Sequence, residues 1–520
     1  MVMLKNKHKH KHKQSGFTIV ELLVVIAVIG ILAALITVGY GAIRISAAGS
    51  VLKSDARNAR VDLENYKTIN NVYPHPQISD SLVFSDGVDV EYDSDGTTYC
   101  LTVSSTAAQT EFYATDDESQ VIEGVCPGSD HVGYDSEAGQ QPPMGLWTDL
   151  SSGYSYVCGI YDEAPYCWGA AANGALGSGS AFTNRSAPYP VRISSGPLLG
   201  KTVNDIEAAN GGSHTCAIAE GEVFCWGRNS YGQVGDVSTS NRNYPVAVST
   251  SGVLAGKTVT DLAVNGVHSC VIADEEMFCW GRNQYGQLGT GSTSAQSIVP
   301  VAVDMSGVLA GKTISQMALG NNHTCVIADG EAFCWGYGAY GLLGRGSTAS
   351  SASPVAVDTT GVLNGKQVTD ISAGDYHTCV VADGEVFCWG MGTRINNGYT
   401  DNESSPVAIN MNGNLGGASV TSVAASYDHS CLVAANDAYC WGSGGSGRLG
   451  TGVNDDELHP VPVINTGALN ERTISSITAG HSHSCVLARG EVFCWGVGTS
   501  GHLGNGLNTT SFEPVQVTNP

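Results

Sequence analysis

The residues of this chain best placed for covalent chemistry are its sixteen cysteines, which fall into eight successive pairs. The last seven pairs share one spacing and recur at a nearly constant interval. An even number of regularly paired cysteines predicts disulfides and an oxidising compartment outside the cytoplasm. The predicted bonds are Cys100–Cys126, Cys158–Cys167, Cys216–Cys225, Cys270–Cys279, Cys325–Cys334, Cys379–Cys388, Cys431–Cys440 and Cys485–Cys494.

The residues between two such cysteines show why they should meet. In the segment CAIAEGEVFC, Glu220 and Gly221 are suited to a two-residue turn between antiparallel strands. Counting back from that turn places Cys216 opposite Cys225, at a position where facing Cα atoms are close enough for a disulfide. A zinc site would need cysteines that converge from different segments, so disulfides are the favoured interpretation.

A histidine precedes the first cysteine in six of the seven repeated units, and Tyr156 takes its place in the other. Six repeated histidines raise the alternative of a metal site, but equivalent positions in separate units are usually too far apart to share one ion. A structural role is therefore predicted for His214, His268, His323, His377, His429 and His483.

Other motifs that would indicate an enzyme are missing from the sequence. It contains no Gly-x-Ser-x-Gly elbow, no zinc-protease motif and no phosphate-binding loop with its lysine. We therefore expect no enzymatic activity and no cofactor. One acidic loop, Asn454-Asp455-Asp456-Glu457, is a possible ligand loop that could hold calcium, with a solvated loop as the alternative.

The elements that must position these residues repeat seven times. Each unit has a short strand, a His-Ser/Thr-Cys strand, a Phe/Tyr-Cys-Trp-Gly strand, a glycine-rich loop and a Pro-Val strand. Four strands repeated seven times predict a seven-bladed, all-β propeller over residues 147–520. We expect the segment Trp147–Leu150 to complete the last blade, and the variable loops after Trp-Gly to carry binding specificity.

These repeats resemble the regulator of chromosome condensation propeller family. The resemblance rests on His214-Thr215-Cys216, Cys225-Trp226-Gly227 and Tyr231-Gly232-Gln233, and on the same pattern in the following units. It implies the propeller fold and a binding scaffold. It does not imply one particular function, since propellers host many activities.

The N-terminus carries a second pattern. A lysine-rich segment precedes the apolar run Phe17–Ile36, which is long enough to cross a membrane as a helix with the basic end in the cytoplasm. Glu21 lies inside this run, where an isolated carboxylate is costly and therefore suggests a function. The small residue Gly16 comes before the apolar run, whereas a secretory signal has its cleavage site after it.

The motif Gly16-Phe17-Thr18-Ile19-Val20-Glu21 resembles the type IV pilin and pseudopilin family. That resemblance implies that a prepilin peptidase cuts between Gly16 and Phe17 and methylates the new amine of Phe17. It also implies that Glu21 pairs with the N-terminal amine of a neighbouring pilin subunit during assembly.

The chain is thus predicted to be a multidomain protein. Residues 1–16 would be a prepilin leader and 17–71 a long α-helix that continues from the membrane as an amphipathic stem. Residues 72–126 would form a small α+β pilin-like head, with a two-residue hairpin turn at Asp95-Gly96, and residues 127–146 a linker. The propeller would follow over 147–520.

The charge balance narrows the possible partners. The chain has 24 Lys and Arg against 48 Asp and Glu, so nucleic acid is an unfavourable ligand. The predicted function is a minor pilin that is held in the inner membrane before assembly and then displays an adhesive propeller at the cell surface. Its ligand would be an extracellular protein or glycan. The alternatives are a pseudopilin of a type II secretion or DNA-uptake machine, and a membrane-anchored propeller without a filament.

Overall fold

The structure is a computed structural model that describes most of the C-terminal part of the chain. It covers residues 146–191, 197–198, 200–395, 401–411, 413–415, 417–470 and 472–520, together with the backbone of four strands between 89 and 123. The chain divides into two compact units, Met1–Met144 and Gly145–Pro520. Each unit is described by itself.

The first unit contains a four-stranded antiparallel sheet in the order β1-β2-β3-β4. Its strands are β1 (Asp89–Ser94), β2 (Tyr99–Ser104), β3 (Glu111–Thr115) and β4 (Ile122–Glu123). The predicted hairpin forms, but the prediction that its turn has two residues was wrong. Ser94 pairs with Tyr99, so four residues connect β1 to β2. This register places Val103 opposite both Val90 and Phe112, which aligns apolar positions across three strands.

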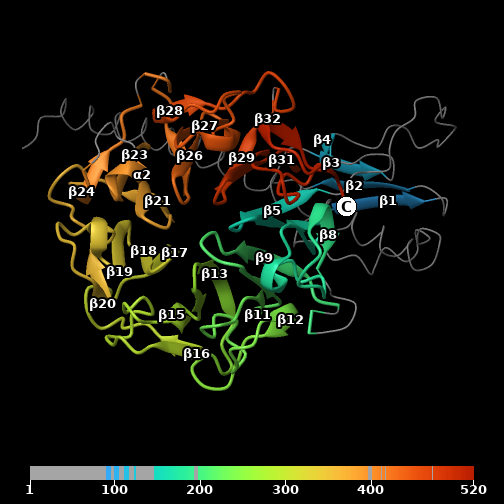
Figure 1. Ribbon diagram of the computed structural model, residues 1–520. Coiled ribbons are helices and arrows are strands. Elements are labelled where there is room, and N and C mark those ends of the chain that lie inside the picture. The colour runs from blue at the N-terminus through green and yellow to red at the C-terminus, as the bar shows by residue number, and fades with distance from the viewer. Residues whose placement is uncertain are drawn as a thin grey trace, which may run out of the picture. The chain divides into compact units, whose positions relative to one another are not determined.

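The second unit is a propeller of seven four-stranded antiparallel sheets, as predicted (Figure 1). The inner strands are β5 (Trp147–Ser152), β9 (Val203–Ala208), β13 (Val259–Asn265), β17 (Ile314–Leu319), β21 (Val368–Ala373), β25 (Val420–Ala425) and β29 (Ile474–Ala479). The second strands, which carry the histidines, are β6 (Tyr156–Tyr161), β10 (His214–Ala219), β14 (His268–Ala273), β18 (His323–Ala328), β22 (His377–Ala382), β26 (His429–Ala434) and β30 (His483–Ala488).

The third strand of each blade ends in the Trp-Gly motif. These strands are β7 (Ala164–Gly169), β11 (Glu222–Gly227), β15 (Glu276–Arg282), β19 (Glu331–Gly336), β23 (Glu385–Gly390), β27 (Asp437–Gly442) and β31 (Glu491–Gly496). The outer strands are β8 (Arg185–Pro190), β12 (Arg242–Ala247), β16 (Gln296–Ala302), β20 (Ser351–Ala356), β24 (Glu403–Ala408), β28 (Glu457–Pro462) and β32 (Ser511–Gln516). Short helical turns follow four of the third strands: η2 (Ala172–Gly174), η3 (Ala339–Gly341), α2 (Gly392–Ile395) and η4 (Gly445–Gly447).

The segment expected to complete the last blade belongs to the first one. Strand β5 pairs with β6 in the order β5-β6-β7-β8, so every blade is built from four consecutive strands. The prediction was wrong because β5 has the same role as the short strand that begins each of the other units. The ring is closed instead by contacts between blades, such as the hydrogen bond from Trp147 N to Gly490 O at 2.9 Å.

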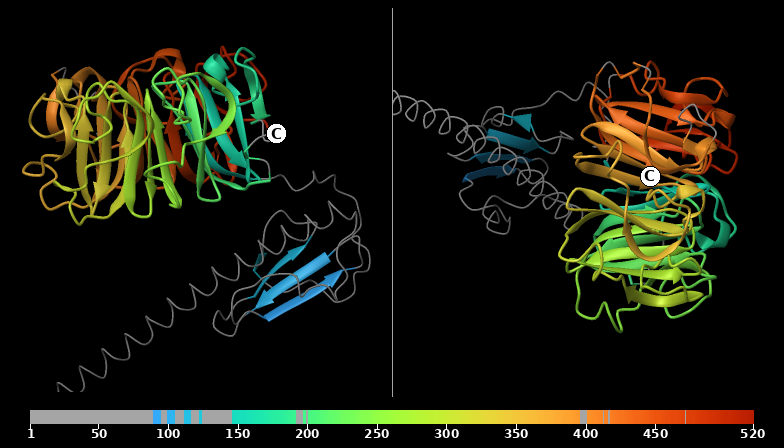
Figure 2. Two further views of the ribbon diagram at one scale, coloured as in Figure 1. Left: turned by 90° about the horizontal axis from the view of Figure 1, so that it is seen from below. Right: turned by 90° about the vertical axis from the view of Figure 1, so that its left-hand side faces the viewer.

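The core of the propeller lies between neighbouring blades. One cluster joins Ile218 and Val223 of the second blade to Val271 and Phe278 of the third, and equivalent clusters lie between other adjacent blades. Each blade therefore buries its apolar side chains against the next one, and Figure 2 shows the blades standing side by side around the ring. Repeats that lack a core of their own must stack to bury apolar surface.

Candidate binding face

The antiparallel order of the strands divides the connections of each blade between two faces. The segments that join inner to second strands, and third to outer strands, lie on one face, which we call the loop face. The hairpin turns between second and third strands, and the links to the next blade, lie on the opposite face, which we call the turn face. The variable loops after Trp-Gly are therefore all on the loop face.

The paired cysteines hold the centre of each blade. Strands β10 and β11 place Cys216 opposite Cys225, in the register that was expected from the turn at Glu220-Gly221. All seven pairs of the propeller lie at disulfide distance, with Cα atoms 4.0–4.1 Å apart, and their cysteines are fully buried. A closed hairpin at this position fixes the direction in which the loop-face segments leave the blade.

The repeated histidines join adjacent blades. Nε2 of each of five histidines hydrogen bonds to a Ser or Thr hydroxyl that follows the histidine position of the next blade. These pairs are His214–Ser269, His268–Thr324, His323–Thr378, His377–Ser430 and His429–Ser484, at 2.7–3.0 Å. Burial lowers the pKa of His214, His268 and His377 to about 3, so these rings are neutral at physiological pH.

The remaining two joints differ. Tyr156 donates from its hydroxyl to His214 O at 2.6 Å, which links the first blade to the second. At the junction of the last and first blades the position opposite His483 is Val157, which has no hydroxyl. His483 is fully buried, and neither ring nitrogen has a hydrogen-bond partner among the described residues. Its ring lies 5.4 Å from that of His502.

The tryptophans anchor the loops of the preceding blade. The indole Nε1 of each Trp-Gly motif donates to a backbone carbonyl in the loop that follows Trp-Gly one blade earlier. Trp280 and Ser269 both donate to Gln233 O, and Trp168 donates to His502 O across the ring junction. The loop face thus rests on fully buried indoles: Trp168, Trp226, Trp280, Trp335, Trp389, Trp441 and Trp495.

A series of aromatic contacts runs across the loop face. Five contacts join rings of adjacent blades, with ring centroids 4.3–6.1 Å apart: Tyr285–Tyr337, Tyr340–Tyr376, Tyr376–Tyr427, Tyr427–His481 and His481–Tyr154. Arg282 continues the series because its guanidinium lies 5.2 Å from the ring of Tyr231 and 5.6 Å from that of Tyr285. We call these nine residues the aromatic arc.

The aromatic arc is exposed enough to meet a ligand. Tyr154 is 42% exposed, and the other members are partly buried. Its residues come either from just before the histidine position or from the loop after Trp-Gly. The arc could not be predicted from the sequence, because these two sets of positions are far apart in each repeat. The tyrosines beside the histidines, such as Tyr376 and Tyr427, were the one available indication.

The acidic loop that was singled out as a possible ligand loop also lies on the loop face. The carboxylate of Asp456 accepts a hydrogen bond from Gly444 N at 2.8 Å. Asn184, Asn241, Ser350 and Asn402 accept the equivalent bond in other blades, so this side chain closes its own loop. Calcium binding at Asn454–Glu457 stays a prediction.

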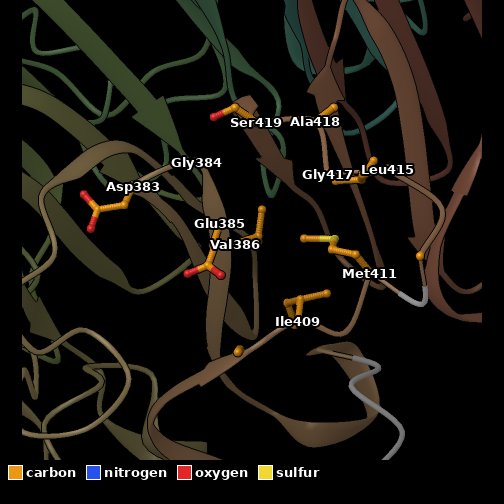
Figure 3. Close-up of a pocket in the computed structure, with 12 residues that line it drawn as sticks. Asp383, Gly384, Glu385, Val386, Ile409, Met411, Leu415, Gly417, Ala418 and Ser419 are labelled. Atoms are coloured by element: carbon orange, nitrogen blue, oxygen red, sulfur yellow. The ribbon is translucent and has the colours of Figure 1, made fainter.

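The turn face is dominated by exposed ion pairs. Lys201, Lys257, Lys312 and Lys366 each contact an acidic residue at the hairpin turn of their own blade, with shortest distances of 2.6–2.8 Å. In the link into the sixth blade the equivalent position is Ala418. That link and the turn Asp383–Glu385 line a cavity of about 350 Å³. Figure 3 shows Ile409 and Met411 near Val386, with the Asp383 carboxylate pointing away from them.

A group of carboxylates that no sequence motif marks lies on the inner strands. Burial, followed by the charges of Asp149 and Asp261, raises the pKa of Asp205 to about 8. Burial and the same group of acids also raise the pKa of Glu207, which accepts from Ser151 Oγ at 2.9 Å. Asp149 accepts from Ile206 N at 3.0 Å and so joins two inner strands. Asp149 and Glu207 accept hydrogen bonds across adjacent inner strands, which is a structural role.

Several predicted residues lie outside the described part of the chain. These are Gly16, Phe17, Glu21 and Cys126, together with the helix predicted for 17–71 and the linker predicted for 127–146. Within the residues that the structure does describe, no helix has the length and apolar character needed to cross a membrane.

Comparisons with known proteins agree with both patterns in the sequence. The family model for the RCC1-like domain matches residues 149–464 and 249–520, and that for the prokaryotic N-terminal methylation motif matches residues 11–37. The ultraviolet-B receptor UVR8 of Arabidopsis thaliana is 29% identical over 365 residues, which cover 69% of this chain and 78% of the receptor. Human E3 ubiquitin-protein ligase HERC2 is 29% identical over 332 residues, but the match covers 62% of this chain and only 6% of that ligase.

Solved structures show the same fold. The crystal structure of human WBSCR16 is 25% identical and has a TM-score of 0.56. The match covers 65% of this chain and 85% of WBSCR16. The crystal structure of Prp20p from Saccharomyces cerevisiae is 22% identical and has a TM-score of 0.57. The match covers 72% of this chain and 88% of Prp20p. The RCC1-like model covers well over half of the chain. The protein therefore belongs to the RCC1-like domain family and combines that propeller with a prokaryotic N-terminal methylation motif.

Proposed function

We propose that this protein is a minor pilin whose propeller is a binding head for a ligand outside the cell. One observation carries the proposal: a methylation motif at 11–37 and an RCC1-like propeller at 149–520 occur in the same chain. The first would place the protein in a filament, and the second would give the filament a rigid surface for recognition.

The N-terminal residues have separate roles in this proposal. A prepilin peptidase cleaves between Gly16 and Phe17, and the new amine of Phe17 is methylated. Glu21 then pairs with the amine of a neighbouring subunit within an apolar bundle. A buried carboxylate and a buried amine are tolerable there only as a pair, because either charge alone costs several kcal/mol.

The propeller would be displayed sparsely or at the end of the filament. A head that spans 147–520 is large for a subunit repeated along a shaft, so a low copy number is favoured. The leader would lie in the cytoplasm before assembly, and the head would face the oxidising side, where seven closed disulfides are stable.

Binding is proposed to occur on the loop face. The aromatic arc and the variable loops lie there on a rigid frame, and exposed aromatic side chains supply large contact area at low entropic cost. The propeller would act by recognition, without chemistry on its ligand.

Mass spectrometry of filaments sheared from the cells tests the proposal. We expect a peptide that begins at N-methylated Phe17, present at low stoichiometry to a major pilin. The processed peptide found only in the membrane fraction would favour a pseudopilin of a secretion or DNA-uptake machine. An uncut leader would overturn the pilin assignment and leave a membrane-anchored propeller.

A further inference from the structure

One sector of the loop face has an unusual charge. The loop-face segments of the second, third and fourth blades contain four arginines and one acid, Asp236, a net charge of 4 − 1 = +3 in a chain of net charge −24. They contain no lysine, glutamate or histidine. We call this region the arginine sector; its segments are 209–213, 228–242, 266–267, 282–295, 320–322 and 337–350.

Three of the four arginines have no carboxylate partner among the described residues. Arg242 pairs with Asp236 at 2.5 Å. By contrast, the other three donate to neutral groups: Arg228 to Ser230, Arg282 to Asn322 and Gln284, and Arg345 to Ala349 O.

The arginines of the fifth and sixth blades provide the contrast. Arg394 and Arg448 both contact Asp428, and the Arg448 charge helps to lower the pKa of that carboxyl to about 2. Partly buried guanidinium groups without a counter-ion attract an incoming carboxylate more strongly than these paired ones, because no neighbouring carboxylate already neutralises their charge.

The tyrosines of the aromatic arc hold the central arginine in place. The guanidinium of Arg282 lies over the rings of both Tyr231 and Tyr285, 5.2 and 5.6 Å from their centroids, and the ring of Tyr337 lies 4.5 Å from that of Tyr285. A guanidinium that is fixed over two rings loses little entropy when its planar donors bind a carboxylate in a bidentate manner. The sector thus combines charge with a pre-formed geometry.

The composition of the sector favours a protein as the partner. Its loops are rich in Tyr, Ser, Gly and Asn, as in RNSYGQVGDVSTSN, and Arg282 lies in the middle one of its three blades. This is the composition of antibody paratopes, and protein interfaces are enriched in Tyr and Arg while lysine is depleted. All four lysines of the propeller contribute instead to ion pairs on the turn face.

We propose that the arginine sector binds a carboxylate-rich patch on a partner protein. The inference rests on the proposed role of the propeller as a binding head, but it does not depend on filament assembly. Arg282 would take a carboxylate beside Tyr231 and Tyr285, while Arg228 and Arg345 attract the acidic surface around it. Such charge complementarity raises the association rate and fixes orientation.

The test compares two triple variants of the full-length chain in detergent. In the first, Arg228→Gln, Arg282→Gln and Arg345→Gln remove three charges from the arginine sector. In the matched control, Lys201→Gln, Lys257→Gln and Lys312→Gln remove three charges from the turn face of the same blades. The probes are a synthetic glutamate-rich peptide and alginate, a polysaccharide that also carries carboxylates.

We expect the arginine variant to bind the peptide at least about tenfold more weakly than the wild type, and the lysine variant to stay within about twofold. Arg282→Lys should lose part of the affinity, because lysine keeps the charge without the planar fork. Circular dichroism melting curves confirm that each variant is folded.

Three outcomes would overturn the inference. Equal losses in both triple variants, or no binding of the peptide by the wild type, would show that the arginine sector has no special affinity for carboxylates on proteins. Alginate bound more tightly than the peptide, through the same arginines, would assign the sector to an acidic glycan instead. None of these outcomes bears on whether Phe17 is processed, so failure here is distinct from failure of the filament assignment.

Discussion

On the turn face, each of four lysines pairs with exposed acids of its own blade, whereas on the loop face buried side chains of one blade hold the loops of another. Exposed ion pairs contribute little to stability, while a fully buried indole with a satisfied N–H contributes a great deal. The comparison teaches that rigidity in this propeller is concentrated beneath the face that varies most in sequence. A varied surface can recognise a ligand only if its loops are held in place.

The largest expected effect comes from removing one of the buried anchors. Trp335 is fully buried and donates to Gln287 O at 3.0 Å. Trp335→Ala should lower the free energy of unfolding of the propeller by about 3–5 kcal/mol, since it opens a cavity and leaves that carbonyl with one donor fewer. Calorimetry measures the loss. Trp335→Phe is the control and should cost less, and a near-neutral Trp335→Ala would contradict the role given to the indoles.

The next effect concerns the acids of the inner strands and depends on pH. The pKa of Asp205 is about 8 in the folded chain, against an ordinary value of 3.8 for an aspartate. Between pH 4 and pH 8 the folded state thus holds a proton that the unfolded chain has released, so this group makes stability fall as pH rises. Asp149, Glu207 and Asp261 face it and act in the same direction.

Asp205→Asn should therefore stabilise the propeller at pH 8, by about 1–2 kcal/mol, and have little effect at pH 4. Melting temperatures measured over this pH range check the prediction. A variant that loses stability with pH as steeply as the wild type would show that Asp205 is not the group responsible.

The third test makes opposite substitutions at the equivalent position of two blades. Thr378→Val removes the partner of His323 and should cost about 1 kcal/mol. Val157→Thr supplies a hydroxyl opposite His483, which has no partner among the described residues, and should gain up to about 1 kcal/mol. Urea unfolding of both variants measures the two changes. The same sign in both would refute the view that this hydrogen bond joins the blades.

The smallest effect is expected on the turn face. Lys312 contacts Glu331 at 2.8 Å in an exposed pair. Lys312→Gln should leave the melting temperature unchanged within error, at low and at high salt, because solvent screens the pair. A loss as large as that of Trp335→Ala would reverse the comparison between the faces.

The local geometry of the blades could be predicted from the sequence. Turn residues such as Glu220-Gly221 fix the register of a hairpin, and the register decides that Cys216 faces Cys225. The place of β5 could not be predicted so simply, because a short strand can pair with either neighbour and only the assembled ring selects one. The aromatic arc escaped notice for a related reason, since it joins residues from two loops in each repeat and from different blades.

The sequence alone therefore determined the repeat, the paired cysteines, the histidine and tryptophan positions and the methylation motif, because each depends on residues close together in the chain. Only the tertiary structure decided which side chains meet across blades. Closure of the ring brought Tyr427 against His481, set Arg282 over two tyrosines and left His483 opposite Val157. Contacts of this kind arise from packing repeats against one another, and no single repeat contains them.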